Sequence, residues 1–285
     1  MLNQSGNNKS IGLLTAFTPE IFKSEYFSRI ISGVTVAARQ TDYDLKLIMI
    51  KDEEYADPKR DILQENKVDG LILLTWTIHP RYVEESEKNP AFPIVIINDF
   101  KPGLKTNVVY CNNKVGIRLA FKHLINRGYK KIGMLQAPDE DSLDAKERYH
   151  AYRELLGEFQ LPFEPSYFRK CDYFFEEDGY LKMMDMIHHE KSLPRALLCF
   201  NDDIAIGALK ALKESHIKCP NDMAVVGYDG IDKSKYVDPP LTVVQQPLEV
   251  MGREMVHLLI GLIEGKLKPP VQKEFMPQLI IRQSS

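Results

Sequence analysis

The chain of 285 residues is long enough for two α/β lobes of ordinary size, and 44% apolar residues support a packed core rather than disorder. Its 37 basic and 40 acidic residues nearly cancel, and the sequence contains no Lys/Arg run typical of nucleic-acid binding. No apolar run approaches the roughly 18 residues of a membrane span, and the polar N-terminal residues lack the features of a secretion signal. We therefore expect a cytoplasmic protein without membrane contact.

Short apolar runs recur along the chain and are continuous rather than alternating, as expected for strands buried on both faces of a parallel sheet. They occupy residues 11–15, 45–50, 70–75, 94–98, 131–136, 196–202, 223–229 and 242–246. Helical patterns lie between them, at residues 26–39, 114–127, 145–159, 204–215 and 248–264. In the second helix apolar residues return every three or four positions, and Gly128 is placed to end it. The alternation predicts a doubly wound α/β fold.

Two proline-containing interruptions, at residues 136–138 and 238–240, suggest that the chain leaves one lobe for a second and later returns. We predict a linker remnant at residues 1–10, an N-terminal lobe of residues 11–136 plus 246–272, and a C-terminal lobe of residues 137–245 plus 273–285. Two such lobes would leave a central cleft between the carboxyl ends of their sheets, where ligands of open α/β folds bind.

The four cysteines are widely spaced and form no C-x-x-C pair: Cys111, Cys171, Cys199 and Cys219. Each lies in or next to an apolar run, which favours buried free thiols over disulfide bonds or a metal site.

Polar side chains stand at the ends of several predicted strands. Asn201 and Asp229 follow two different strands, whose carboxyl ends should meet at one sheet edge. An amide offers a donor and an acceptor, and a carboxylate offers two acceptors, which suits a ligand with neighbouring hydroxyls. For Asp202 or Asp203 the simpler role is to cap the helix that begins near residue 204. We therefore predict a ligand-binding edge that contains Asn201 and Asp229.

Two further side chains allow two interpretations each. Trp76, the only tryptophan, follows a strand end and either packs under a loop or stacks on a ligand. Arg148, in the first turns of a predicted helix, either contacts a ligand or forms a surface ion pair with Asp144 or Glu147.

Enzyme motifs are missing from the sequence. It has no G-x-G-x-x-G after a strand, no G-x-S-x-G and no H-E-x-x-H, so neither a dinucleotide cofactor nor a hydrolytic centre is predicted. The His-His-Glu run at residues 188–190 fits a solvated helix end better than a ligand pair. Asp202, Asp203 and Asp229 could hold Mg²⁺, but a phosphoryl-transfer site is the weaker interpretation. We expect no catalysis, no metal and no cofactor.

Several long stretches resemble one family. "ALLCFNDDIAIGALKALKE", "DMAVVGYDGID", "YVDPPLTVVQQPLEVMGREMVHLLIGLIEG" and "HLINRGYKKIGML" are similar to the effector-binding region of the lactose-repressor/galactose-repressor transcription regulators. The resemblance extends in the same order over residues 9–285. It implies the periplasmic-binding-protein type I fold, with two Rossmann-like lobes joined by three crossovers.

The resemblance also implies a set of effector-binding residues. Asn201 and Asp229 match the sugar-gripping positions, and Arg148, with Lys146 as its neighbour, falls where the family presents an arginine. Tyr173 matches an aromatic position, or Phe174 takes this role because the segment is one residue longer here. Tyr26 and Phe27 resemble the aromatic pair of the purine-repressor branch. The candidate set is Phe17, Tyr26, Phe27, Trp76, Arg148, Tyr173, Asn201 and Asp229.

Two departures from the family pattern leave the effector unidentified. The loop between Thr15 and Tyr26 is longer than usual, and Asn112-Asn113 stands where Asp-Asn is frequent.

The family implies a regulatory module that binds a small effector and forms a homodimer, and the candidate residues favour a sugar as that effector. Family members begin with a helix-turn-helix of roughly 60 residues that reads operator DNA. Because only ten residues precede the first predicted strand, we expect that module to lie outside this chain, by excision or natural loss. Two alternatives stay open: a solute-binding protein of a sugar uptake system, which should carry a signal peptide, and a purine-responsive repressor.

Overall fold

The computed structural model describes residues 9–16, 23–50, 68–75, 82, 84, 88, 89, 91–98, 105–138 and 142–285. The chain divides into two compact units, each formed by separate segments of the sequence. Unit 1 comprises Met1–Tyr110 and Pro247–Phe275, and unit 2 comprises Cys111–Gln246 and Met276–Ser285. The chain therefore crosses between the units three times.

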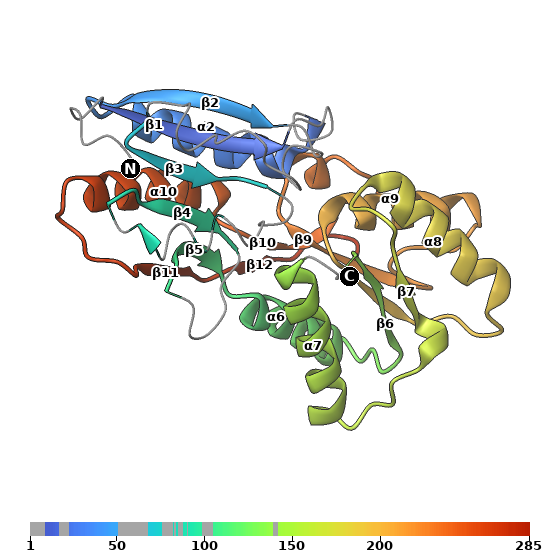
Figure 1. Ribbon diagram of the computed structural model, residues 1–285. Coiled ribbons are helices and arrows are strands. Elements are labelled where there is room, and N and C mark those ends of the chain that lie inside the picture. The colour runs from blue at the N-terminus through green and yellow to red at the C-terminus, as the bar shows by residue number, and fades with distance from the viewer. Residues whose placement is uncertain are drawn as a thin grey trace. The chain divides into compact units, whose positions relative to one another are not determined.

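Unit 1 contains a sheet with the strand order β11-β5-β4-β3-β1-β2 (Figure 1). Its elements are β1 (Ser10–Ala16), α2 (Glu25–Ala38), β2 (Asp44–Ile50), β3 (Gly70–Leu73), β4 (Ile94–Ile97), β5 (Asn107–Cys111), α10 (Leu248–Ile263) and β11 (Gln272–Phe275). The pairs β1–β2, β1–β3, β3–β4 and β4–β5 are parallel. Every residue of β3 and β4 is buried, as the continuous apolar runs predicted.

Helices α2 and α10 of unit 1 approach each other closely because each has a glycine at the contact. A Cβ atom on Gly33 would lie 2.1 Å from the carbonyl oxygen of Glu249. A Cβ atom on Gly252 would lie 2.2 Å from the carbonyl oxygen of Ile30. Both distances are far below van der Waals contact, so neither position accepts a side chain without separating the helices.

Unit 2 repeats this plan with the strand order β12-β10-β9-β8-β6-β7. Its elements are α6 (Asn113–Asn126), β6 (Ile132–Gln136), α7 (Leu143–Glu158), η1 (Pro165–Tyr167), β7 (Phe168–Lys170), α8 (Glu176–His189), β8 (Ala196–Cys199), α9 (Asp202–Glu214), β9 (Ala224–Asp229), η2 (Asp232–Lys235), β10 (Thr242–Gln245) and β12 (Gln278–Ile280). β12 runs antiparallel to β10, and the pairs from β10 through to β7 are parallel.

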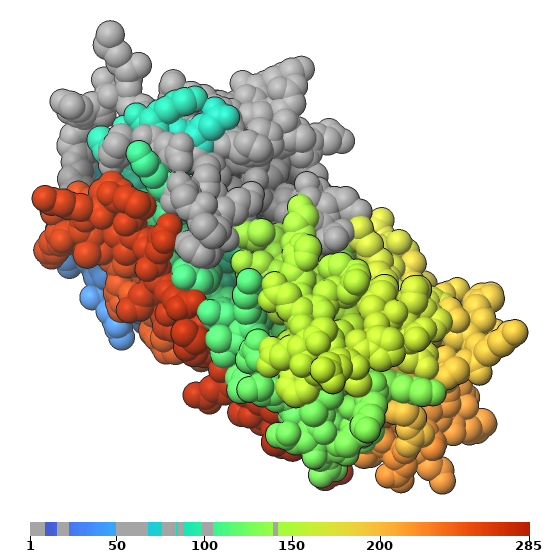
Figure 2. All heavy atoms as spheres, turned by 90° about the horizontal axis from the view of Figure 1, so that it is seen from below, coloured from blue at the N-terminus to red at the C-terminus, as the bar shows by residue number. Residues whose placement is uncertain are grey.

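Different helices cover the two faces of the unit 2 sheet (Figure 1). Because alternate strand residues point to opposite faces, Leu197 packs with residues of α8 and α9, whereas Leu198 packs with residues of α6 and α7. Figure 2 shows α6 and α7, in green and yellow-green, side by side on an outer face of unit 2. An ion pair of 2.7 Å between Arg118 and Glu158 joins them. Gly128, with a φ of 88°, follows α6 as predicted.

The first crossover lies earlier than the sequence analysis placed it. We expected it after residue 136, but the chain enters unit 2 between Tyr110 and Cys111. The segment 113–136 belongs to unit 2 because α6 packs on the second sheet and β6 pairs with β7 and β8. Neither proline-containing interruption is a crossover: residues 136–138 connect β6 to α7, and residues 238–240 precede β10. The later crossovers follow Gln246 and Phe275.

All four cysteines are free thiols, as predicted, and three of them, Cys111, Cys171 and Cys199, are buried. Burial raises the pKa of the Cys111, Cys171 and Cys219 thiols to about 12. It raises the pKa of Cys199 well above its usual range. Among the described residues, no helix combines the length and the apolar character that crossing a membrane requires.

Candidate functional site

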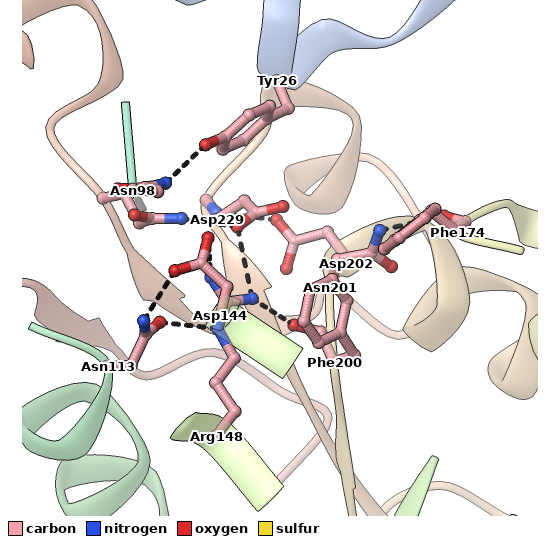
Figure 3. Close-up of polar contacts among 12 residues, drawn as sticks. Tyr26, Asn98, Asn113, Asp144, Arg148, Phe174, Phe200, Asn201, Asp202 and Asp229 are labelled. Carbon is pink, nitrogen blue, oxygen red and sulfur yellow. Dashed lines mark hydrogen bonds and ion pairs between the residues drawn. The ribbon is translucent and has the colours of Figure 1, made fainter. Parts of the chain in front are cut away.

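The carboxyl ends of the unit 2 strands bring polar side chains together at one sheet edge (Figure 3). Asn201 follows β8, Asp229 ends β9 and Gln246 follows β10. These strands are adjacent and parallel, so their carboxyl ends share this edge. The chain places β7 on one side of β6 and β8 on the other, and open α/β sheets bind ligands outside the carboxyl ends at such a switch point. This edge of unit 2 is the candidate site.

Arg148 lies at the centre of the site. It projects from α7, on the same helix face as buried Ala145 and Tyr152, and its side chain is only 2% exposed. Its Nε donates to Asn113 Oδ1 at 2.8 Å, and its Nη1 donates to the carbonyl oxygen of Phe200 at 2.6 Å. The sequence left open a surface ion pair with Asp144 or Glu147; Arg148 does face Asp144, at 3.9 Å between Nη2 and Oδ2, but in a buried setting.

Two aromatic rings hold the guanidinium of Arg148. Its central carbon lies 3.6 Å from the centre of the Tyr228 ring and 4.4 Å from that of Phe200. Such cation–π contacts favour a planar guanidinium over an ammonium group, so this position is specific for arginine. The rings and the two hydrogen bonds fix the orientation of the positive charge.

Asp229 is the buried carboxyl of the site. Its Oδ1 accepts a hydrogen bond of 2.8 Å from Gln246 Nε2 and lies 3.8 Å from Arg148 Nη1. Burial raises the pKa of this carboxyl to about 7, although Arg148 and the hydrogen bond from Gln246 act in the opposite direction. Its φ of 108° is unusual for a non-glycine residue and costs about 1–3 kcal/mol. The carboxylate is therefore held in a strained backbone conformation at the end of β9.

Asn201 caps α9, a role that the sequence analysis gave to Asp202 or Asp203. Its Oδ1 accepts from the Ile204 amide at 2.8 Å, and its Nδ2 donates to the Phe174 carbonyl at 2.9 Å. The helix begins at Asp202, as expected, but Asp202 points elsewhere. Asn201 remains 7% exposed, so its role toward a ligand stays a prediction.

Three further polar residues belong to the site: Asn113 and Gln246 were not predicted as site residues, and Asp144 was named only as a possible surface partner of Arg148. Asn113 is 2% exposed and donates from Nδ2 to Asp144 Oδ1 at 2.7 Å and to Glu147 Oε2 at 2.9 Å. Asp144 Oδ2 lies 3.9 Å from Arg148 Nη2, and Gln246 contacts Asp229 as described. The available signals were the Asn-Asn pair after β5 and the position of Gln246 directly after an apolar strand.

The predicted aromatic residues have different environments. Tyr173 is 63% exposed and stacks on Phe175 with 6.3 Å between ring centres, whereas Phe174 is partly buried and packs on Phe200. In unit 1, Phe27 is 2% exposed and lies edge-on to Tyr26, whose hydroxyl accepts from Asn98 Nδ2 at 2.7 Å. Phe17 and Trp76 lie outside the described residues.

The arrangement suits recognition of a polar, uncharged ligand edge. One oriented guanidinium and one buried carboxylate present a donor and an acceptor side by side, and Asp144 partly neutralises the guanidinium. The Oε1 atom of Gln246 is buried and has no hydrogen-bond partner among the residues that the structure describes. Gln246 Oε1 and the Asp229 carboxyl are acceptors at this edge, and the Arg148 guanidinium is a donor, which suits a ligand with hydroxyl groups because a hydroxyl both donates and accepts.

Comparisons with known proteins show what the chain is similar to. A family model described as "Periplasmic binding protein-like domain" matches residues 121–285. The HTH-type transcriptional repressor PurR of Haemophilus influenzae is 32% identical over 280 residues, which are 97% of this chain and 81% of that protein.

Two solved structures share the fold across the chain. The transcriptional regulator CelR in complex with cellobiose is 26% identical, with a TM-score of 0.87 over 98% of this chain and 85% of that one. The lac repressor dimer bound to operator and an anti-inducer is 22% identical, with a TM-score of 0.83 over 99% of this chain and 95% of that one. With its two parallel-sheet α/β units and its identity to a curated repressor, the chain belongs to the lactose-repressor/galactose-repressor family of transcriptional regulators, of which it forms the effector-binding region.

Proposed function

We propose that this region binds an uncharged sugar or related polyhydroxylated effector at the carboxyl edge of the unit 2 sheet. The observation that carries the proposal is the buried, oriented pair formed by Arg148 of α7 and Asp229 at the end of β9. Arg148 donates to ligand hydroxyls, Asp229 accepts from them, and Asn201 borders the same edge. The cellobiose complex of CelR supports a sugar as the effector class.

Charge balance argues for a neutral ligand. The guanidinium of Arg148 already faces Asp144 at 3.9 Å and Asp229 at 3.8 Å. A phosphate or carboxylate on the ligand would meet these two carboxylates in a desolvated site, where like-charge repulsion is weakly screened. A neutral ligand avoids this repulsion and uses the same hydrogen-bonding groups.

Binding regulates transcription without chemical change in the effector. Asp229, with a pKa near neutrality, has the acidity that proton transfer requires, but the named relative is a repressor and supports recognition instead. The protein acts in the cytoplasm as a homodimer, and operator DNA is bound through a separate DNA-reading module. The lac repressor dimer on its operator supports this assembly.

Isothermal titration calorimetry of the chain with cellobiose, ribose, hypoxanthine and glucose 6-phosphate tests the ligand class. We expect saturable binding of a neutral saccharide and none of the phosphorylated sugar. Asp229→Asn and Arg148→Lys should each weaken that binding by about 1–3 kcal/mol, because a buried partner is left unpaired. Arg153→Lys, an exposed change on the same helix, is the matched control and should leave affinity unchanged.

A purine effector is the second candidate. Tyr26 and Phe27 form an edge-to-face pair with ring centres 5.3 Å apart, an aromatic surface suited to a nucleobase. Only Tyr26 retains appreciable exposure, since Phe27 is buried. Saturable binding of hypoxanthine, lost in Tyr26→Ala and accompanied by no saccharide binding, would replace the sugar proposal with this one.

A further inference from the structure

Asp202 is a buried carboxyl that the proposed ligand contacts do not use. It is the first residue of α9 and is 0% exposed. Its Oδ2 accepts two backbone hydrogen bonds, from the amides of Gly230 and Ile231, each at 2.8 Å. Its Oδ1 has no hydrogen-bond partner within the described part of the chain. One side chain of α9 therefore holds two consecutive amides of the segment that follows β9.

Gly227 leaves the space that this carboxyl occupies. A Cβ atom at Gly227 would lie 2.3 Å from Asp202 Oδ1 and 3.3 Å from Asp202 Cα. The N-terminal turn of α9 therefore rests directly on β9, two residues before Asp229. The Asn201 cap fixes the start of the helix at this place.

The two amides lie directly after the most strained residue of the site. Asp229 has a φ of 108° and Gly230 a φ of 77°, so two consecutive residues adopt left-handed conformations. Such a turn persists only where surrounding contacts hold it. The bonds to Asp202 begin one residue after Asp229, and on the other side the Asp229 carbonyl accepts from the Gln246 amide at 3.0 Å.

We propose that Asp202 is a positioning residue for effector binding: by holding the amides of Gly230 and Ile231, it keeps Asp229 in the left-handed conformation in which its carboxylate meets Gln246 and faces Arg148. This inference rests on the proposed function, because it gives Asp229 the role of ligand acceptor. Burying a carboxyl is unfavourable, and here the two amide hydrogen bonds offset part of that cost. The pKa of Asp202 is raised well above its usual value, by burial first and then by the charge of Asp229.

Four variants of the whole chain separate positioning from simple charge loss. Asp202→Ala removes the acceptor of both amides. Asp202→Asn removes the charge but keeps an oxygen that can accept from both. Asp203→Asn, in the same helical turn, is the matched control, and Gly227→Ala displaces the Asp202 carboxyl without altering it.

Three measurements are made on each variant. Nuclear magnetic resonance gives the hydrogen-exchange rates of the Gly230 and Ile231 amides. It also gives the pKa of Asp229 from the pH titration of its ¹³C carboxyl signal, which is assigned because it is missing in Asp229→Asn. Calorimetry with cellobiose gives affinity. In Asp202→Ala we expect amide exchange to accelerate about tenfold or more and cellobiose binding to weaken about tenfold, because both hydrogen bonds that hold the turn are lost. The pKa of Asp229 should fall toward its usual value, because a released turn exposes the carboxyl to water.

The conservative and control variants decide the interpretation. Asp202→Asn and Asp203→Asn should stay within about threefold of the wild-type exchange rates and affinity, and Asp202→Asn should keep the pKa of Asp229 raised. The proposal is wrong if Asp202→Ala changes neither exchange nor that pKa, or if Asp202→Asn lowers the pKa as much. If Asp202→Ala does not fold, Gly227→Ala must give the same three changes. If wild type binds none of the neutral compounds, the proposed function fails, while exchange and titration still decide the role of Asp202.

Discussion

Replacing Asp229 by Asn should change how stability depends on pH. Burial raises the pKa of this carboxyl from 3.8 to about 7 in the folded chain, whereas the unfolded chain titrates near 3.8. Between these values the folded state holds a proton that the unfolded state has released, so the contribution of Asp229 to stability falls as pH rises. It is fully present below pH 3.8 and is lost by about pH 7.

The size of this pH-dependent loss of stability follows from the pH interval in which Asp229 is protonated in the folded state only. From pH 5 to about 7 the loss is about 1.4 kcal/mol per pH unit, which gives about 3 kcal/mol. Asp229→Asn has no such group, so its free energy of unfolding relative to wild type should rise by about 3 kcal/mol between pH 5 and pH 8. Contributions from groups whose titration does not depend on Asp229 cancel in this difference.

Urea unfolding of both proteins at pH 5, 6, 7 and 8, followed by far-ultraviolet circular dichroism, measures this difference. Glu177→Gln, which removes an exposed carboxylate from α8, controls for the loss of one negative charge. Curves for wild type and Asp229→Asn that stay parallel within about 0.5 kcal/mol across this range would refute the argument that burial controls this carboxyl.

Three further predictions concern packing and assembly. Arg148→Met should destabilise the chain by about 3–5 kcal/mol, because the carboxyl groups of Asp144 and Asp229 lose the cation that they face. Thermal unfolding measures this, and an unchanged melting temperature would contradict the central role of Arg148. Gly33→Ala should lower the free energy of unfolding, measured with urea, by about 1–3 kcal/mol, because its methyl group meets the α10 backbone. Gly157→Ala should raise it by about 0.5–1 kcal/mol, because no atom lies within 4 Å of the new Cβ. Equal effects of the two substitutions would contradict the close packing of α2 and α10. Sedimentation at micromolar concentration should give a homodimer, and a monomer at all concentrations would remove that part of the proposal.

The central strands and most helices could be predicted because their sequence signals are local. Strands such as β3 and β8 are continuous apolar runs, and the buried face of α6 repeats every three or four residues. The edge strands β7, β11 and β12 were not predicted, since Phe168–Lys170 and Gln272–Phe275 are polar or only partly buried. One inner strand, β5, was missed too, although four of its five residues are buried. The helix α8 was missed as well. The first crossover was misplaced because a helix that follows a strand looks the same whether it stays in one unit or enters the next.

The site was predicted less completely than the fold. Arg148, Asn201 and Asp229 were identified, two of them by their positions after strands and Arg148 by the family resemblance. Asn113 and Gln246 could not be identified, because their roles depend on partners distant in the chain: Arg148 for Asn113 and Asp229 for Gln246. The cap was assigned to the wrong neighbour because Asn201 and Asp202 are both good capping residues. Only the backbone geometry distinguishes them.

The distribution of thiols gives unit 2 natural reporters of its own. Cys111, Cys171, Cys199 and Cys219 all belong to unit 2. A thiol whose pKa is about 12 exists as thiolate in roughly one molecule in ten thousand at pH 8, so alkylating reagents modify these cysteines chiefly when unit 2 opens. Alkylation kinetics, recorded on an unlabelled sample, therefore follow the opening of unit 2.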